Sequence, residues 1–248
     1  MERWSGRVAV VTGASSGIGY AVARELVKKG LKVVGLARRA DRIEELAASL
    51  KDSPGKLYAV KTDLTKEEDI LSAFKWVKEN LGGVDVLVNN AGVGKLDNLY
   101  DGSVADWKQM IDVNVLALSI CTKEAIRSMK ERGVDDGHII HINSVAGHYY
   151  SSLPGIGMYS ATKHAVTVLT ESLRRELTKL NSKIKITSIS PGGVRTEMVA
   201  RANIPEEVLK TMSLLEPEDL AEAVVYTLST PPRVQVHEIT IRPVGEKF

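Results

Sequence analysis

The chain has 248 residues and a mass of 27.0 kDa, and 44% of its residues are hydrophobic and 26% charged. These values are typical of a globular protein and exclude intrinsic disorder, collagen-like repeats and a coiled coil as the main organisation. The 33 basic and 31 acidic residues leave a formal charge of +2, too small an excess to predict a nucleic-acid partner.

The cysteine and histidine content argues against a metal centre. The single cysteine, Cys121, excludes an intramolecular disulfide and a cysteine zinc site, and the scattered histidines show no metal-ligand spacing. The first residues lack the apolar run of a signal peptide, and no segment approaches the ~18 apolar residues of a membrane span. We therefore expect a cytoplasmic protein with no metal and no membrane span.

Short β-branched runs alternate with helical patterns along the whole chain. The expected strands are Val8–Thr12, Lys32–Ala37, Leu57–Lys61, Val84–Asn89, His138–Asn143, Ile184–Ser190 and Glu238–Ile241. The expected helices are Ile18–Lys29, Asp41–Leu50, Lys66–Asn80, Asp106–Lys130, Met158–Leu180 and Glu218–Leu228. This alternation predicts a Rossmann-type α/β fold, a doubly wound parallel seven-stranded sheet with helices on both faces. Without a linker or repeat, residues 1–248 are expected to form a single domain.

A glycine-rich loop separates the first expected strand from the first expected helix. Its sequence is Thr-Gly-Ala-Ser-Ser-Gly-Ile-Gly over residues 12–19. A pyrophosphate can approach backbone N–H groups at a positive helix end only where no Cβ obstructs it. We expect this loop to bind a dinucleotide through Gly13, Ser15, Ser16, Gly17, Ile18 and Gly19. The alternative is an ordinary turn that starts a helix.

The end of the second expected strand indicates which dinucleotide would bind. An acidic residue there would hold the ribose 2′-hydroxyl of NAD, but the strand ends in Arg38 and Arg39. Guanidinium groups match phosphate in geometry and charge, which favours the 2′-phosphate of NADP(H). The alternative is that both arginines are solvated surface charges.

Tyr159 and Lys163 lie four residues apart at the start of a long expected helix. This spacing places both side chains on one helix face. A phenol has a pKa of about 10, and a nearby ammonium would lower it by stabilising the phenolate. Such a tyrosine could exchange a proton with an oxygen atom during hydride transfer. The alternative is an exposed contact on the helix surface.

Further motifs follow the expected strands in a consistent order. They are Asn89-Asn90-Ala91-Gly92, Asn114, Ser144 and Pro191-Gly192, in addition to the glycine loop and the Tyr159/Lys163 pair. In this set the sequence resembles the short-chain dehydrogenase/reductase family over nearly its whole length. The resemblance implies an oxidoreductase of the EC 1.1.1 type, which transfers hydride between a nicotinamide and a CH–OH group.

The resemblance also implies roles for matching residues. Tyr159 would donate and accept the proton, Lys163 would lower its pKa and hold the nicotinamide ribose, and Ser144 would bind the substrate oxygen. Asn114 would hold a water that links Lys163 to solvent, unless it is a helix residue satisfied by solvent. The remaining expected cofactor contacts are Asp63, Leu64, Asn90, Ala91, Gly92, Pro191, Gly192, Val194 and Thr196. Asp63 could instead only cap the next helix.

More closely, the sequence resembles a narrower group that contains insect farnesol dehydrogenases and vertebrate cytosolic NADP-dependent ketosteroid and dicarbonyl reductases. This suggests a lipophilic alcohol or carbonyl as substrate. Ser144 and Tyr159 lie 15 positions apart (159 − 144), slightly more than the family usually shows, with the surplus in residues 148–155. The expected apolar substrate contacts are Val93, Tyr149, Tyr150, Leu153, Met158 and Met198, under a lid formed by residues 192–215.

The sequence therefore predicts an NADP(H)-dependent oxidoreductase in which Tyr159 acts as general acid and base. One alternative is a catalytically silent dinucleotide-binding protein that senses redox state. A second is a sugar-nucleotide epimerase, but the chain lacks residues for the substrate subdomain of such enzymes. Family members pair the helices expected at Asp106–Lys130 and Met158–Leu180 between subunits, so we expect a homodimer or homotetramer.

Overall fold

The computed structural model describes residues 1–150, 153–200, 207 and 212–246. Within these parts the strands are β1 (Val8–Thr12), β2 (Lys32–Ala37), β3 (Lys56–Lys61), β4 (Val86–Asn89), β5 (His138–Ile142), β6 (Lys185–Pro191) and β7 (Glu238–Ile241). They form one seven-stranded sheet in the order β3-β2-β1-β4-β5-β6-β7. All six pairings are parallel, so the predicted fold class is confirmed.

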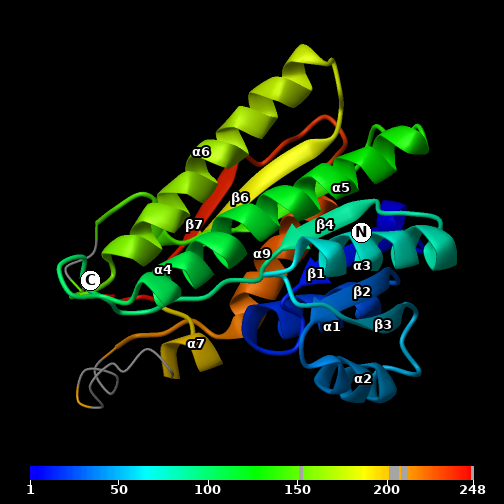
Figure 1. Cartoon of the computed structure of the whole chain (residues 1–248). Helices are drawn as coiled ribbons and strands as arrows, with labels where there is room; N and C mark the ends of the chain where they lie inside the picture. The colour runs from blue at the N-terminus through cyan, green and yellow to red at the C-terminus, as the bar shows by residue number, and fades with distance from the viewer. Residues whose placement is uncertain (151–152, 201–206, 208–211, 247–248) are drawn as a thin grey trace.

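Along the chain the helices alternate with the strands, as the pattern predicts, and in space they flank the sheet (Figure 1). They are α1 (Gly17–Lys28), α2 (Ala40–Ser49), α3 (Glu67–Leu81), α4 (Val104–Ile111), α5 (Leu118–Glu131), α6 (Gly157–Lys179), α7 (Glu197–Ala200) and α9 (Pro217–Ser229). The long helix expected at Asp106–Lys130 is divided, because a π-helical turn over Asp112–Ala117 separates α4 from α5. Among the described residues, no helix is long and apolar enough to cross a membrane.

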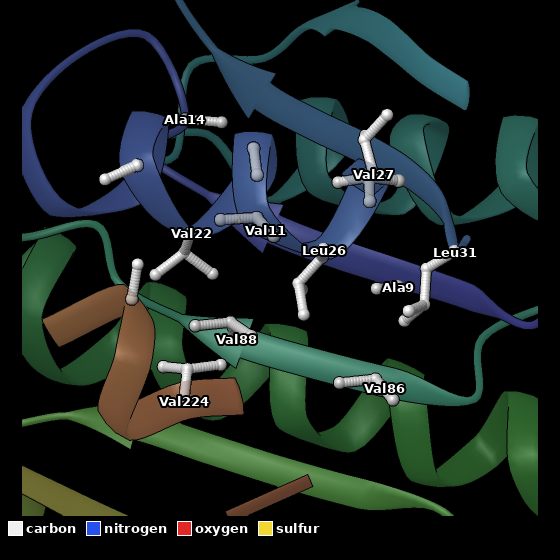
Figure 2. Packing of buried hydrophobic residues seen from close by; sticks show 14 of the residues in the cluster. Ala9, Val11, Ala14, Val22, Leu26, Val27, Leu31, Val86, Val88 and Val224 are labelled. Carbon is white, nitrogen blue, oxygen red and sulfur yellow. The ribbon is translucent and has the colours of Figure 1, made fainter. Parts of the chain in front are cut away.

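Each face of the sheet has its own apolar core, because successive side chains of a strand point to opposite faces. From β1, Ala9 and Val11 pack with residues of α1, α2 and α9. Figure 2 shows Val22 and Leu26 of α1 close to these strand residues. The alternate residues Val8 and Val10 pack with α3, α5 and α6. Burial on both faces explains the continuous apolar runs in the sequence.

The carboxyl ends of the central strands lie at one edge of this rigid sheet. In a parallel sheet the loops that follow neighbouring strands meet at that edge, where open α/β sheets bind ligands. The glycine loop follows β1, residues 90–94 follow β4, Ser144 follows β5, and residues 192–196 follow β6. The topology therefore gathers the predicted motifs from distant parts of the chain.

Candidate active site

The glycine loop turns sharply from β1 into α1. Gly13 and Gly17 have φ angles of +69° and +56°, in the left-handed region that favours glycine. A Cβ on Gly19 would lie 2.4 Å from both the Asn90 Nδ2 and the Gly13 carbonyl oxygen. The N-cap residue Ser16 makes no side-chain capping bond within the described structure. The loop thus leaves the positive end of α1 accessible to an anion.

The end of β4 is tied directly to this loop. Thr12 Oγ1 accepts hydrogen bonds of 3.0 Å from the backbone N–H groups of Asn90 and Ala91. The Asn90 Nδ2 in turn donates to the carbonyl oxygens of Thr12, at 2.9 Å, and Gly13, at 3.3 Å. The Asn90 side chain therefore holds the loop in shape. Sequence reasoning gave no such role to Thr12, although a polar residue ending a buried strand could have drawn attention.

Tyr159, Lys163 and Ser144 converge at the end of β5. Lys163 is buried, and its Nζ donates a 3.0 Å hydrogen bond to the carbonyl oxygen of Ile142. The same Nζ lies 5.8 Å from the centre of the Tyr159 ring. Ser144 Oγ accepts from the Ala146 N–H at 3.1 Å and forms a hydrogen bond with the Tyr159 side chain. The structure thus brings together all three residues of the predicted set.

The pKa of Tyr159 differs from the sequence-based expectation. Burial raises it to about 12, while the hydrogen bond with Ser144 acts in the opposite direction. Burial also lowers the pKa of Lys163 to about 8. Burial is the larger cause, because a buried phenolate is costly, and the Lys163 ammonium lies beside the ring and donates to the Ile142 carbonyl oxygen. At neutral pH the phenol therefore carries its proton and can donate it. The expected lowering of the Tyr159 pKa by Lys163 stays a prediction.

Asn114 lies in the π-helical turn and is almost fully buried. Its Oδ1 accepts from the Val93 N–H at 2.8 Å, and its Nδ2 donates to the Val93 carbonyl oxygen at 2.9 Å and to Thr162 Oγ1 at 3.0 Å. Both amide protons are therefore used by protein groups, so the side chain has none to donate to a water. Asn114 thus fixes the segment after β4 against the start of α6, and its expected contact with a water stays a prediction. Such π-helical turns often occur at functional sites.

The arginines at the end of β2 have different surroundings. Arg38 is exposed, and its charge helps to lower the pKa of Asp63. Arg39 donates to Ser16 Oγ at 3.0 Å and pairs with Glu197 of α7 at 3.0 Å. Arg42 pairs with the other Glu197 oxygen at 2.5 Å. Sequence reasoning missed Arg42 and Glu197; Arg42 follows Arg39 at helical spacing, but no local pattern pointed to Glu197.

Asp63 and Leu64 lie in the turn between β3 and α3. Asp63 Oδ1 accepts from the Thr65 N–H at 3.1 Å and from its hydroxyl at 2.8 Å. The first of these bonds is the main cause that lowers the pKa of Asp63. Leu64 packs partly buried against the core on the α3 side. Asp63 thus stabilises its own turn, and its contact with adenine stays a prediction.

The segment after β6 passes over the glycine loop. A Cβ on Gly17 would lie 3.0 Å from the Thr196 Cγ2, so Thr196 lies directly against the loop. Val194 is 5% exposed and belongs to the core on the α1 side, which leaves little of its side chain to face a ligand. The Gly193 N–H donates to Glu246 Oε1 at 3.2 Å, so a residue near the end of the described chain supports the segment that starts with Pro191 and Gly192.

The predicted substrate contacts fall into two groups. A Cβ on Gly94 would lie 3.4 Å from both the Met198 Sδ and the Tyr159 Cδ2, so these side chains border the same space. Val93, which precedes Gly94, is half-buried, and so are Leu153 and Met158, which precede Tyr159. Tyr149 and Tyr150 are instead 62% and 77% exposed. Part of the predicted lid, residues 201–206 and 208–211, lies outside the described residues. Sequence reasoning missed Gly94.

The described residues contain no group of three side chains suited to a metal ion. A family model described as short chain dehydrogenase matches residues 7–207. The chain belongs to this family. The resemblance inferred from the motifs is therefore confirmed, and the chain is an oxidoreductase of the short-chain dehydrogenase class.

Full-length relatives agree with this assignment. The chain is 54% identical to a farnesol dehydrogenase of Aedes aegypti over 251 residues, covering 100% of both chains. It is 55% identical to dehydrogenase/reductase SDR family member 11 of Bos taurus over 253 residues, covering 99% of both. The closer resemblance that the sequence suggested, to insect farnesol dehydrogenases and a vertebrate reductase group, is thus confirmed.

Solved structures of other dehydrogenases superimpose well on this one. An alcohol dehydrogenase from Thermococcus sibiricus complexed with 5-hydroxy-NADP has a TM-score of 0.86 at 30% identity, covering 98% of this chain and 99% of the other. A closed form of serine dehydrogenase complexed with NADP+ also has a TM-score of 0.86, at 31% identity over 97% and 96% of the two chains. The fold, including the edge that carries the motifs, is shared with these enzymes.

Proposed function

We propose that this short-chain dehydrogenase uses NADP(H) to interconvert a lipophilic alcohol and the matching carbonyl compound, with Tyr159 as the general acid and base. The observation that carries the proposal is the convergence of Ser144, Tyr159 and Lys163 at the sheet edge that also holds the glycine loop. A proton donor beside a dinucleotide cradle is the arrangement that hydride transfer to a carbonyl requires.

The residues around the glycine loop fit a nicotinamide dinucleotide with a 2′-phosphate. A Cβ at Gly17 would narrow the space between the loop and Thr196, and a Cβ at Gly19 would collide with Asn90 and Gly13. The start of α1 offers N–H groups to a pyrophosphate. Arg39 lies against Ser16 of that loop and Arg38 lies beside it in sequence, and both can bind phosphate. The NADP-bound structural neighbours support this choice. When bound, NADP(H) would supply or accept the hydride.

In the direction of carbonyl reduction, Tyr159 gives its proton to the substrate oxygen as the carbonyl carbon gains the hydride. The raised pKa keeps the phenol protonated until that oxygen gains negative charge. Ser144 can donate a hydrogen bond to the same oxygen, because it already lies within hydrogen-bond reach of the phenol. The Lys163 ammonium then stabilises the phenolate that remains. In the direction of oxidation the Tyr159 phenolate takes the proton from the alcohol oxygen as the carbon loses the hydride.

A lipophilic substrate fits the side chains that border Tyr159. Met198 borders the same space as the Tyr159 ring beside Gly94, which follows Val93 in the chain. Leu153 and Met158 lie close to Tyr159 in the chain. The relative from Aedes aegypti named for farnesol supports an isoprenoid alcohol, and the vertebrate relatives support our prediction of a ketosteroid-type or dicarbonyl compound as the related alternative. Tyr149, being exposed, would contact only the entrance.

We also propose that residues 1–248 form a single dinucleotide-binding domain whose residues 192–215 cover the substrate, and that the enzyme works in the cytoplasm as a homodimer or homotetramer. Exposed apolar side chains support a subunit contact through the helices that the sequence singled out. These are Ile111 at the end of α4, Leu116 in the π-helical turn and Val168 on α6.

The test is a spectrophotometric screen of the purified full chain, with NADPH or NADP+ against farnesol, ketosteroid and dicarbonyl compounds. Replacing Tyr159 with phenylalanine should lower kcat by about 10²- to 10⁴-fold and leave the Kd for NADPH nearly unchanged. The control is Tyr226→Phe, an exposed tyrosine on α9, which should retain full activity. Wild-type rates in Y159F would remove Tyr159 from the mechanism. Tight NADPH binding without turnover of any compound would favour the redox-sensor alternative.

A further inference from the structure

A carboxylate bridges two arginines at the entrance to the glycine loop. Glu197, the first residue of α7, pairs with Arg39 at 3.0 Å through one oxygen and with Arg42 at 2.5 Å through the other. The bridge joins the segment after β6 to the end of β2 and the first turn of α2. The three side chains are 34–43% exposed, so a ligand from solvent can reach them.

The position of this bridge matters because Arg39 also donates to Ser16 of the glycine loop at 3.0 Å. The guanidinium that lies against the cradle is therefore the same group that binds Glu197. Hydrogen bonds from Arg42 and Arg39 hold the pKa of the Glu197 carboxyl below its usual range, so it is ionised at neutral pH. An anionic side chain thus occupies Arg39, one of the two arginines to which the proposed function assigns the 2′-phosphate.

The Glu197 carboxylate and a 2′-phosphate would repel each other if both bound these arginines. Arg39 and Arg42 contribute two positive charges, and Glu197 neutralises one of them. A phosphate monoester carries a charge of about −1.5 to −2 at neutral pH, and like charges in contact repel. A 2′-phosphate that binds Arg39 therefore competes with the carboxylate for this guanidinium. An unphosphorylated ribose presents a hydroxyl instead, and a carboxylate beside β2 is the group that accepts its hydrogen bond in NAD sites.

We propose that Glu197 is an internal competitor of the 2′-phosphate and sets how strongly this enzyme distinguishes NADP(H) from NAD(H). The inference rests on the proposed use of NADP(H). With NADP(H), the phosphate takes Arg39 from Glu197, and the cost of breaking that ion pair weakens binding. With NAD(H), Glu197 stays in place and remains available to the 2′-hydroxyl. Glu197 thereby makes the affinity for NADP(H) relative to NAD(H) smaller than it would be with the arginines alone.

The experiment is calorimetric titration of the full chain with NADPH, NADH, 2′,5′-ADP and 5′-AMP. The third probe carries the 2′-phosphate without nicotinamide, and the fourth lacks that phosphate. In Glu197→Gln the affinities for NADPH and 2′,5′-ADP should rise by about twofold to fivefold, the range expected for a partly exposed ion pair. The affinities for NADH and 5′-AMP should stay unchanged or fall. Glu197→Ala should give the same pattern if the glutamine variant is poorly folded.

The matched control is Glu171→Gln. Glu171 also bridges two arginines, Arg174 and Arg175, but on α6 and away from the glycine loop. Its replacement should leave all four affinities unchanged. Unchanged or weaker NADPH binding in both Glu197 variants would overturn the inference, and so would equal gains for NADPH and NADH.

The same titrations separate this inference from the proposed cofactor. If wild type prefers NADPH, and Arg39→Ala abolishes that preference while Glu197→Gln does not change it, only the role of Glu197 fails. If wild type binds NADPH and NADH equally and Glu197→Gln leaves them equal, the cofactor preference fails, and the inference that depends on it fails too. A preference for NADPH that appears only in Glu197→Gln would support the inference.

Discussion

Two buried histidines of β5 predict a loss of stability under mild acid. His138 and His141 are almost fully buried, and burial lowers the pKa of each from 6.5 to about 3. His141 bonds Thr170 Oγ1 at 2.9 Å and Thr122 Oγ1 at 3.3 Å, while His138 bonds Thr187 Oγ1 at 2.8 Å. Both imidazoles are therefore neutral in the folded chain, and water is not available to solvate a second proton.

The sign and size of the effect follow from proton binding. Below pH 6.5 the unfolded chain takes up a proton at each histidine, whereas the folded chain does so only near pH 3. Stability is therefore fully present above the unfolded pKa and is lost as the pH falls. From about pH 7.5 to about pH 5.5 each histidine removes about 1.4 kcal/mol from the free energy of unfolding, and the two together about 3 kcal/mol. Carboxylates titrate mainly below this window.

Urea unfolding followed by circular dichroism measures this loss, at one fixed protein concentration because oligomers respond to mass action. His138→Gln and His141→Gln should each remove about half of the pH dependence between the two pH values, whatever their effect on absolute stability. The double variant should show almost none of it. A double variant that loses as much stability as wild type over this range would refute the reasoning.

Three further predictions concern the site. Replacing Arg38 and Arg39 with alanine should weaken NADPH binding by about 2 kcal/mol and spare NADH, as fluorescence titration would measure; equal losses would contradict the phosphate assignment. Gly19→Ala places a Cβ 2.4 Å from Asn90 Nδ2 and should cost about 1–3 kcal/mol of stability, whereas Gly157→Ala, with open space around it, should cost none in the same urea titration. Asn114→Ala breaks three hydrogen bonds, one of them buried and two partly buried, and should lower the unfolding free energy by about 2–3 kcal/mol; an unchanged melting curve would disprove that role.

The strands could be predicted almost completely from the sequence, with each end within two residues of its observed place. Their β-branched runs are buried on both faces, so the local pattern and the tertiary environment agree. The helix expected at Asp106–Lys130 could not be predicted in detail. Its apolar periodicity continues through the π-helical turn, which depends on Asn114 reaching Val93 and Thr162 in distant segments.

The candidate site divides in the same way. Tyr159 and Lys163 could be paired from their helical spacing, because one helix turn fixes their distance. The pKa of Tyr159 could not be predicted, since it depends on how deeply the phenol is buried and on where the ammonium of Lys163 points. The bridge from Glu197 to Arg39 joins residues 158 positions apart, and only the packed loops bring them together.

The polar partners of His141 also determine how β5 aligns with its neighbours. His141 faces Thr122 of α5 and Thr170 of α6, and Thr122 Oγ1 also accepts from Asn89 Nδ2 at 2.9 Å. A slip of β5 by one residue would turn the imidazole to the opposite face and leave these groups buried without partners. Apolar residues alone would tolerate such a slip, because valine and isoleucine fill both faces of the sheet. The hydrogen bonds of His141 thus fix the register of β5, and with it the position of Ser144 next to the Tyr159 hydroxyl.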